Sequence, residues 1–127
     1  RMSWPSIDTA PFRTNLQTLV GAALANGVSV TLMTQPSTWN SQTDATAAGR
    51  HWMLSHYREA DMDAALAQFN DTTRLVGRQQ AVPLCDLEKV MPKDGAYIYD
   101  DVHLTPAGAA MAARELAKTM AVAVPRR

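Results

Sequence analysis

A helix that ends at a glycine and leads straight into an apolar strand is the feature that most constrains this fold. Residues 11–26 place apolar side chains at helical spacing, and Asn26-Gly27 supplies the left-handed residue that ends many helices. The next seven residues, Val28–Thr34, are β-branched and mostly apolar, as a strand buried on both faces of a parallel sheet requires. A helix followed directly by such a strand is half of a β-α-β unit. The sequence therefore predicts an α/β fold.

The rest of the chain continues this alternation of helices and strands. Asp8 or Thr9 can cap the first helix, Asp61 can cap the second, and Thr105 can cap the last, which opens with Pro106. The predicted elements are helix 11–26, strand 28–34, helix 61–80, strand 82–87, a helical turn at 86–91 and helix 106–120. This order is typical of the end of a parallel-sheet fold. We expect one domain over residues 1–127, a flavodoxin-like three-layer α/β/α architecture that is incomplete because its first strands are absent.

A long polar segment, residues 35–60, separates the first predicted strand from the second predicted helix. Loops of this length are usually functional or disordered. Trp39, Trp52 and Tyr57 fall within the segment and favour a packed loop over a disordered one. These aromatic side chains either anchor the loop or wall a pocket, and the sequence leaves both interpretations open.

The composition narrows the classes of partner. Of the 127 residues, 46% are hydrophobic and 19% are charged, which indicates a soluble globular protein without a membrane-spanning segment. Twelve basic residues balance twelve acidic residues, and no basic run occurs apart from Arg126-Arg127. A nucleic-acid partner is therefore disfavoured, because neutralising phosphates requires a clustered positive patch.

The residue types that bind metals and cofactors are sparse. The single cysteine, Cys85, excludes an internal disulfide and a cysteine-based zinc site, and its apolar neighbours indicate an inert buried thiol. His51 and His56 are five residues apart, which misses the spacing of a helical metal pair. The glycines form no phosphate-binding pattern. We expect neither a metal nor an organic cofactor.

The chemistry of the chain concentrates just before its last predicted helix. Asp100 precedes His103 by three residues and Asp101 precedes it by two. In a loop, a carboxylate at this spacing can meet the imidazole. A carboxylate that fixes the tautomer of a histidine and stabilises its charged form is the base half of a nucleophilic hydrolase site. On the pattern alone, a turn-capping carboxylate beside a surface histidine is an equally good interpretation.

The wider context resembles a known family. Residues 99–108 read Tyr-Asp-Asp-Val-His-Leu-Thr-Pro-Ala-Gly and precede an Ala-rich helix. This stretch resembles the last conserved block of the SGNH (GDSL-type) esterase and lipase family. Upstream, the helix and strand over 12–34, the turn Thr34-Gln35-Pro36, residues 62–70 and the strand 82–87 resemble the later elements of that family in the same order. The resemblance covers nearly the whole chain, although only the Asp100–His103 block is specific.

The resemblance implies a serine esterase or lipase-like hydrolase that acts on acyl esters, such as acetylated sugars or short-chain lipids. Asp100 would orient His103, His103 would be the general base, and Asp101 would be a structural carboxylate. That family carries its nucleophile in a Gly-Asp-Ser block and its oxyanion-hole Gly and Asn in two further blocks, and none of these occurs here. The candidate serines lack the strand–turn–helix context of a nucleophile; they include Ser3, Ser6, Ser37, Ser41 and Ser55.

We therefore expect the C-terminal part of such a hydrolase, with the serine supplied from elsewhere. Arg1-Met2-Ser3-Trp4 resembles neither a natural start nor a signal peptide, which indicates a processed product or a fragment and leaves the compartment unknown. The alternative is a non-catalytic binding or assembly module on the same scaffold. Two strands cannot bury their own edges, so a homodimer, or a second chain that completes the sheet, is also expected.

Overall fold

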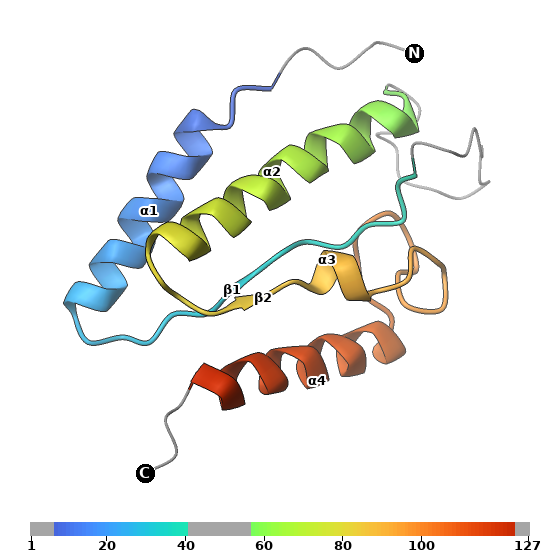
Figure 1. The fold of residues 1–127 in the computed structure, drawn as a ribbon. Coiled ribbons are helices and arrows are strands. Elements are labelled where there is room, and N and C mark those ends of the chain that lie inside the picture. Colours follow the sequence, from blue (N-terminus) through green and yellow to red (C-terminus); the bar gives the residue numbers. More distant parts are fainter. Residues whose placement is uncertain (1–6, 41–56, 124–127) are drawn as a thin grey trace.

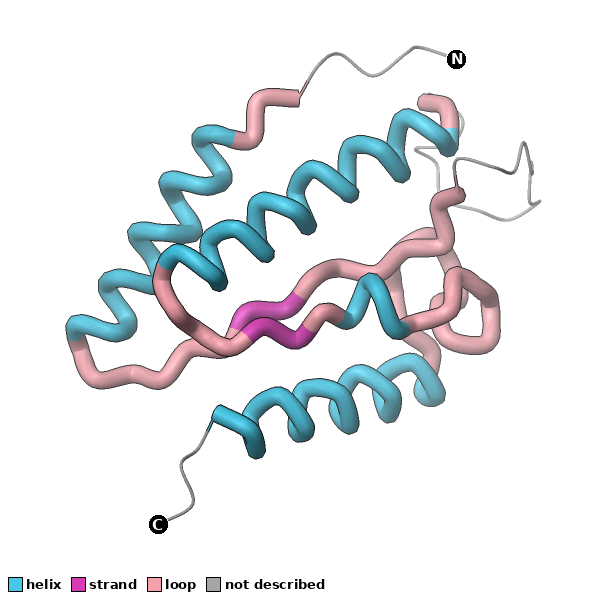
Figure 2. Tube along the Cα trace, in the orientation of Figure 1, coloured by secondary structure: helices cyan, strands magenta, loops and turns pink. Residues whose placement is uncertain are grey.

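A computed structural model describes residues 7–40 and 57–123 of the chain (Figure 1). Its elements are α1 (Ala10–Ala25), β1 (Leu32–Met33), α2 (Glu59–Gln79), β2 (Leu84–Cys85), α3 (Leu87–Val90) and α4 (Pro106–Ala123). Figure 2 shows three long helices around two short strands. Of the predicted long segment 35–60, residues 41–56 lie outside the described residues, and with them His51, Trp52 and His56.

The strands form the middle of three layers. β1 and β2 run parallel, with Leu32 opposite Leu84 and Met33 opposite Cys85. α2 connects them as the crossover helix. In Figure 1, α1 and α2 cover one side of the strands and α4 covers the other. The predicted α/β class with an incomplete parallel sheet is therefore confirmed.

Two apolar clusters hold the layers together. The first joins α1 and α2 to the strands, and its buried members are Val20, Leu32, Val76 and Val82. The second joins the β2–α3 region to α4, and its buried members are Cys85, Leu87, Met91 and Ile98. Cys85 is buried, as its apolar neighbours predict. Burial of such side chains contributes about 1.5–3 kcal/mol each, so the clusters fix the position of every described helix.

The strands are much shorter than predicted. The sequence predicts strands at 28–34 and 82–87, but each covers only two residues. The Leu32 and Thr34 N–H groups donate to the Pro83 and Cys85 carbonyls. Within the described ranges the sheet has no third strand, so the segment before Leu32 has no partner that would extend its pairing.

Two further details of the helices differ from the sequence prediction. α2 begins at Glu59, and the cap position is Arg58 rather than Asp61. Asp61 lies in the first turn and accepts two hydrogen bonds from the Arg58 guanidinium. On α1, Leu19 is 68% exposed although its spacing predicts a place on the buried face, because α2 and the strands pack only against the side of α1 that carries Leu16 and Val20.

None of the helices that the structure describes is both long and apolar enough to span a lipid bilayer.

Candidate active site

Asp100 and His103 lie in a tight hairpin between α3 and α4. Residues 97–105, here called the Asp–His hairpin, fold back on themselves through an antiparallel contact between Ile98 and Leu104. The Tyr99 N–H donates to the His103 carbonyl at 3.1 Å. Figure 1 shows this orange loop next to α3, on the side toward which the two strands run. Parallel folds place their sites at the carboxyl ends of the strands, so the hairpin has the expected location.

The start of α4 closes the hairpin. The Thr105 hydroxyl accepts a hydrogen bond from the Gly108 N–H at 3.1 Å, which is the capping contact that the sequence predicts. The same hydroxyl donates to the Ala96 carbonyl at 2.6 Å. Thr105 therefore ties the first turn of α4 to the loop that precedes the hairpin.

The two predicted site residues meet directly. His103 Nδ1 lies 2.7 Å from Asp100 Oδ2. The other carboxylate oxygen, Oδ1, accepts hydrogen bonds from the backbone N–H groups of Val102 and His103, both at 2.8 Å. An ionised carboxylate only accepts, so the neutral imidazole donates from Nδ1 and keeps its free lone pair on Nε2. The arrangement fixes both the orientation and the tautomer of the ring.

The hydrogen bonds also set the charge of Asp100. Partial burial raises the pKa of this carboxyl, but the backbone N–H groups of His103 and Val102, together with the His103 imidazole, outweigh that effect and lower the pKa to about 2. Asp100 is therefore ionised throughout the neutral range, as an orienting carboxylate must be.

Acid titration should reveal this bond in the stability of the chain. Because the folded pKa of Asp100 is depressed, its contribution is complete above the ordinary pKa near 3.8 and is lost as the pH falls toward about 2. We expect Asp100→Asn to remove about 1 kcal/mol from the free energy of unfolding at neutral pH and to flatten its decline in this acid window. Urea unfolding at a series of pH values measures both effects. If the free energy of unfolding of the variant fell with pH as steeply as that of the original chain, the hydrogen bonds of Asp100 would not be the source of this decline.

His103 remains open to solvent while its partner is more enclosed. The His103 side chain is 63% exposed and the Asp100 side chain 19%. The Tyr99 ring stacks on the imidazole, with ring centroids 5.9 Å apart and planes inclined by 22°. An accessible imidazole is a requirement for a base that takes a proton from another group.

Asp101 has a very different environment from its neighbour. Asp101 is buried, with 1% of the residue exposed. Among the residues that the structure describes, neither of its carboxylate oxygens has a hydrogen-bond partner. The resemblance implies a structural carboxylate, yet its only hydrogen bond in the described parts of the chain is made by its backbone carbonyl, which accepts from the Thr38 N–H at 3.0 Å.

The segment after β1 reaches the hairpin, and the sequence gives no local signal for this. The Thr38 hydroxyl donates to the Asp100 carbonyl at 3.0 Å. The Gln35 side chain donates to the Val102 carbonyl at 3.3 Å. Trp39, on the same segment, is buried and packs with Met62, Tyr57 and Val102. Trp39 and Tyr57 thus anchor this region, which is one of the two roles left open by the sequence.

A second cluster of charged groups lies beyond the ends of the strands. Arg74 of α2 is nearly buried and pairs with Asp71, Asp86 and Glu88. The Asp86 carboxylate also accepts a hydrogen bond from the Thr34 hydroxyl at 3.0 Å. The hydrogen bonds from the Arg74 guanidinium are the main cause that holds the pKa of Asp86 below its usual range. Thr34 follows β1, Asp86 follows β2 and Glu88 lies in α3, so the cluster ties α2 to both strands and to α3.

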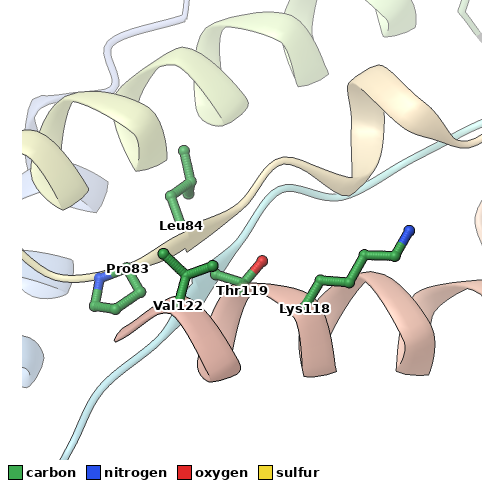
Figure 3. A pocket seen from close by; sticks show the side chains of 5 residues that line it. All are labelled: Pro83, Leu84, Lys118, Thr119 and Val122. Carbon is green, nitrogen blue, oxygen red and sulfur yellow. The ribbon is translucent and has the colours of Figure 1, made fainter. Parts of the chain in front are cut away.

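One pocket lies beside the last turns of α4, at the opposite end of that helix from the hairpin. Figure 3 shows a pocket of about 500 Å³ lined by Pro83 and Leu84 and by three side chains of the last turns of α4. The helix residues are Lys118, Thr119 and Val122. The hairpin instead adjoins the first turn of α4, so this pocket does not contain the Asp100–His103 pair.

The described residues supply neither a metal cluster nor an accessible serine beside His103. Residues 7–40 and 57–123 contain no group of three or more His, Cys, Asp or Glu side chains that could hold a metal ion. Ser37 lies one residue before Thr38, but the residue is buried, at 2% exposed. The candidates Ser3, Ser6, Ser41 and Ser55 lie outside the described residues.

Comparison with protein families decides the family. Residues 8–126 match the family model described as "SGNH hydrolase-like domain, acetyltransferase AlgX". The chain belongs to this SGNH hydrolase-like family. Searches of curated proteins and of solved structures give no match.

The family assignment agrees with the fold. The residues that match the family model include both strands, all described helices and the Asp–His hairpin. The resemblance drawn from residues 99–108 and the preceding elements is thereby confirmed at the level of the family. The scaffold is hydrolase-like. In its structure the Asp100 carboxylate contacts the His103 imidazole.

Proposed function

We propose that Asp100 and His103 are the orienting carboxylate and the general base of a serine hydrolase or acyltransferase that acts on acyl esters. The observation that carries this proposal is the 2.7 Å bond from His103 Nδ1 to an Asp100 carboxylate whose other oxygen is held by two backbone N–H groups. This is the arrangement in which a carboxylate fixes the tautomer of a catalytic histidine and stabilises the imidazolium that forms. The family description, which names an acetyltransferase, supports acetyl esters as the substrate class.

The proposed reaction needs a serine from outside the described residues. Its hydroxyl oxygen would attack the acyl carbonyl while its proton passes to His103 Nε2, which is the free nitrogen. The imidazolium would then return that proton to the departing alcohol. Water as the second nucleophile gives hydrolysis, and a sugar hydroxyl gives acyl transfer. The donors that stabilise the oxyanion would also come from outside the described residues.

The 127-residue chain alone should therefore fail to turn over activated esters through a triad. We expect its rate of p-nitrophenyl acetate hydrolysis to match that of the His103→Ala variant within about twofold, because an exposed imidazole without a positioned serine contributes little. The release of p-nitrophenol measures both rates. Rapid turnover that disappears in His103→Ala would show that the serine lies within this chain.

The complementary test concerns the source of the serine. An in-frame Gly-Asp-Ser block encoded upstream of Arg1 would support the hydrolase. We expect a polypeptide that contains both parts to hydrolyse p-nitrophenyl acetate, and His103→Ala to lower its kcat by about three orders of magnitude or more. The absence of such a block in the gene would remove the support for a nucleophile in the same polypeptide.

A non-catalytic binding or assembly module is the second candidate. It is favoured by the two-stranded sheet, in which no described strand covers the outer edge of β1. Exposed parallel edges pair readily with another chain. In that case a second copy, or a separate polypeptide, would complete the sheet. Light scattering tests this pairing. A concentration-dependent dimer would support it, and a monomer at all concentrations would argue against it.

A further inference from the structure

The backbone of the Asp–His hairpin accepts hydrogen bonds from a segment that lies more than sixty residues earlier in the chain. Three consecutive carbonyls of the hairpin accept hydrogen bonds from residues 35–38, here called the support segment. The Thr38 hydroxyl donates to the Asp100 carbonyl at 3.0 Å and the Thr38 N–H donates to the Asp101 carbonyl at 3.0 Å. The Gln35 side-chain amide donates to the Val102 carbonyl at 3.3 Å.

These bonds complement those made by the Asp100 carboxylate. The carboxylate holds the N–H groups of Val102 and His103, whereas the support segment holds the carbonyls of residues 100–102. The backbone of the turn is thus fixed from both sides. Figure 1 shows the cyan chain after β1 passing beside the orange loop before α4.

The support segment is itself fixed to α2 by one buried side chain. Asn70 is 2% exposed. Its Oδ1 accepts a hydrogen bond from the Gln35 N–H and its Nδ2 donates to the Gln35 carbonyl, both at 2.9 Å. A side-chain amide that satisfies both backbone groups of one residue takes the place of a neighbouring strand at that position. Burial makes these bonds costly to lose.

We propose that Thr38 and Asn70 are positioning residues for the His103 base. They act through the backbone of the hairpin, whose carbonyls the support segment holds, rather than on the imidazole itself. The inference deepens the proposed function, on which its catalytic meaning rests. The bond between Asp100 and His103 fixes the ring within the hairpin, and the support segment fixes the hairpin relative to the sheet and α2. A base displaced by about 1 Å can lose about a hundredfold in rate, so such a second anchor has a direct chemical purpose.

The test compares two buried threonines whose hydroxyl groups donate to different parts of the chain. Thr38→Val keeps the shape of the side chain and removes the donor to Asp100. Thr73→Val is the control, because the buried Thr73 hydroxyl donates to the Phe69 carbonyl within α2 and does not touch the hairpin. Thr38→Ser restores the hydroxyl. The readout is hydrogen exchange of the Val102 and His103 backbone amides in the 127-residue chain, with the melting temperature recorded in parallel.

We expect Thr38→Val to accelerate exchange of these two amides about fivefold, which corresponds to the loss of one neutral hydrogen bond. Thr73→Val should leave them within about twofold of the original rate, and Thr38→Ser should restore the slow rate. Asn70→Asp, which replaces the Nδ2 donor by an oxygen facing the Gln35 carbonyl, should accelerate the exchange further. If Asn70→Asp does not fold, the three threonine variants still decide the matter.

Equal exchange in Thr38→Val and Thr73→Val would overturn the proposal, because the hairpin would then be held without the support segment. The readout involves no substrate, so its result is independent of the proposed function. Local acceleration by Thr38→Val, together with no ester hydrolysis by a serine-containing polypeptide, would sustain the positioning and reject the function.

Discussion

Gly108→Ala should destabilise the chain by about 3 kcal/mol and lower its melting temperature by about 10 °C. A β-carbon at this position would lie 2.0 Å from the carbonyl oxygen of Tyr97. That oxygen belongs to the backbone of the hairpin and accepts the Thr105 N–H, so it cannot move without opening the turn. The first turn of α4 and the Asp–His hairpin must therefore separate.

Gly21→Ala is the matched control for this substitution. Gly21 also lies within a helix, and apart from its chain neighbours and the backbone of that helix a β-carbon there would meet no atom within 4 Å. Alanine should stabilise α1 by about 0.5–1 kcal/mol, because glycine is the weaker helix former. Thermal unfolding of both variants separates the loss of glycine from the steric effect. A Gly108→Ala variant as stable as Gly21→Ala would show that α4 does not pack closely on the hairpin.

Asp101→Asn should change stability in the opposite direction from Gly108→Ala and raise the free energy of unfolding by about 2 kcal/mol. The Asp101 carboxylate is buried, and no described residue donates a hydrogen bond to it. An uncompensated ionised carboxylate costs several kcal/mol to bury, whereas a neutral amide of the same shape costs about 1–3 kcal/mol.

Asp94→Asn provides the comparison, because Asp94 is an exposed carboxylate in the loop before the same hairpin. Its Oδ1 accepts the Ala96 N–H, which an amide oxygen can also do, so the change should stay within about 0.5 kcal/mol. Denaturant unfolding at neutral pH measures both variants. A clear loss of stability in Asp101→Asn would mean that a cationic group in the chain compensates this carboxylate, since removing one partner of a buried pair destabilises.

The sequence predicts the parts of the site that depend on local spacing. Asp100 and His103 are three residues apart in a turn, so their contact needs only the backbone geometry of that turn. Thr105 and Pro106 mark the start of α4 because capping is a property of neighbouring residues. The parallel pairing of β1 with β2 is predicted differently, from the alternation of helices and strands along the chain.

The contacts between distant segments could not be predicted in this way. Thr38 and Gln35 bind the hairpin across more than sixty residues, and nothing in their immediate neighbours indicates those partners. Asn70 follows helical spacing like any polar residue, yet its amide anchors Gln35. The lengths of the strands also depend on what lies beside them, because a strand ends where its hydrogen-bond partners end.

The 15N chemical shifts of the His103 ring report directly whether His103 is an oriented base. At alkaline pH we expect a protonated Nδ1 and an unprotonated Nε2, because the Asp100 carboxylate can only accept. In Asp100→Asn this preference should collapse, so that both tautomers are populated. A protonated Nε2 in the unmodified chain would leave no lone pair to receive the proton of a serine, and would contradict the assignment of His103 as an oriented base.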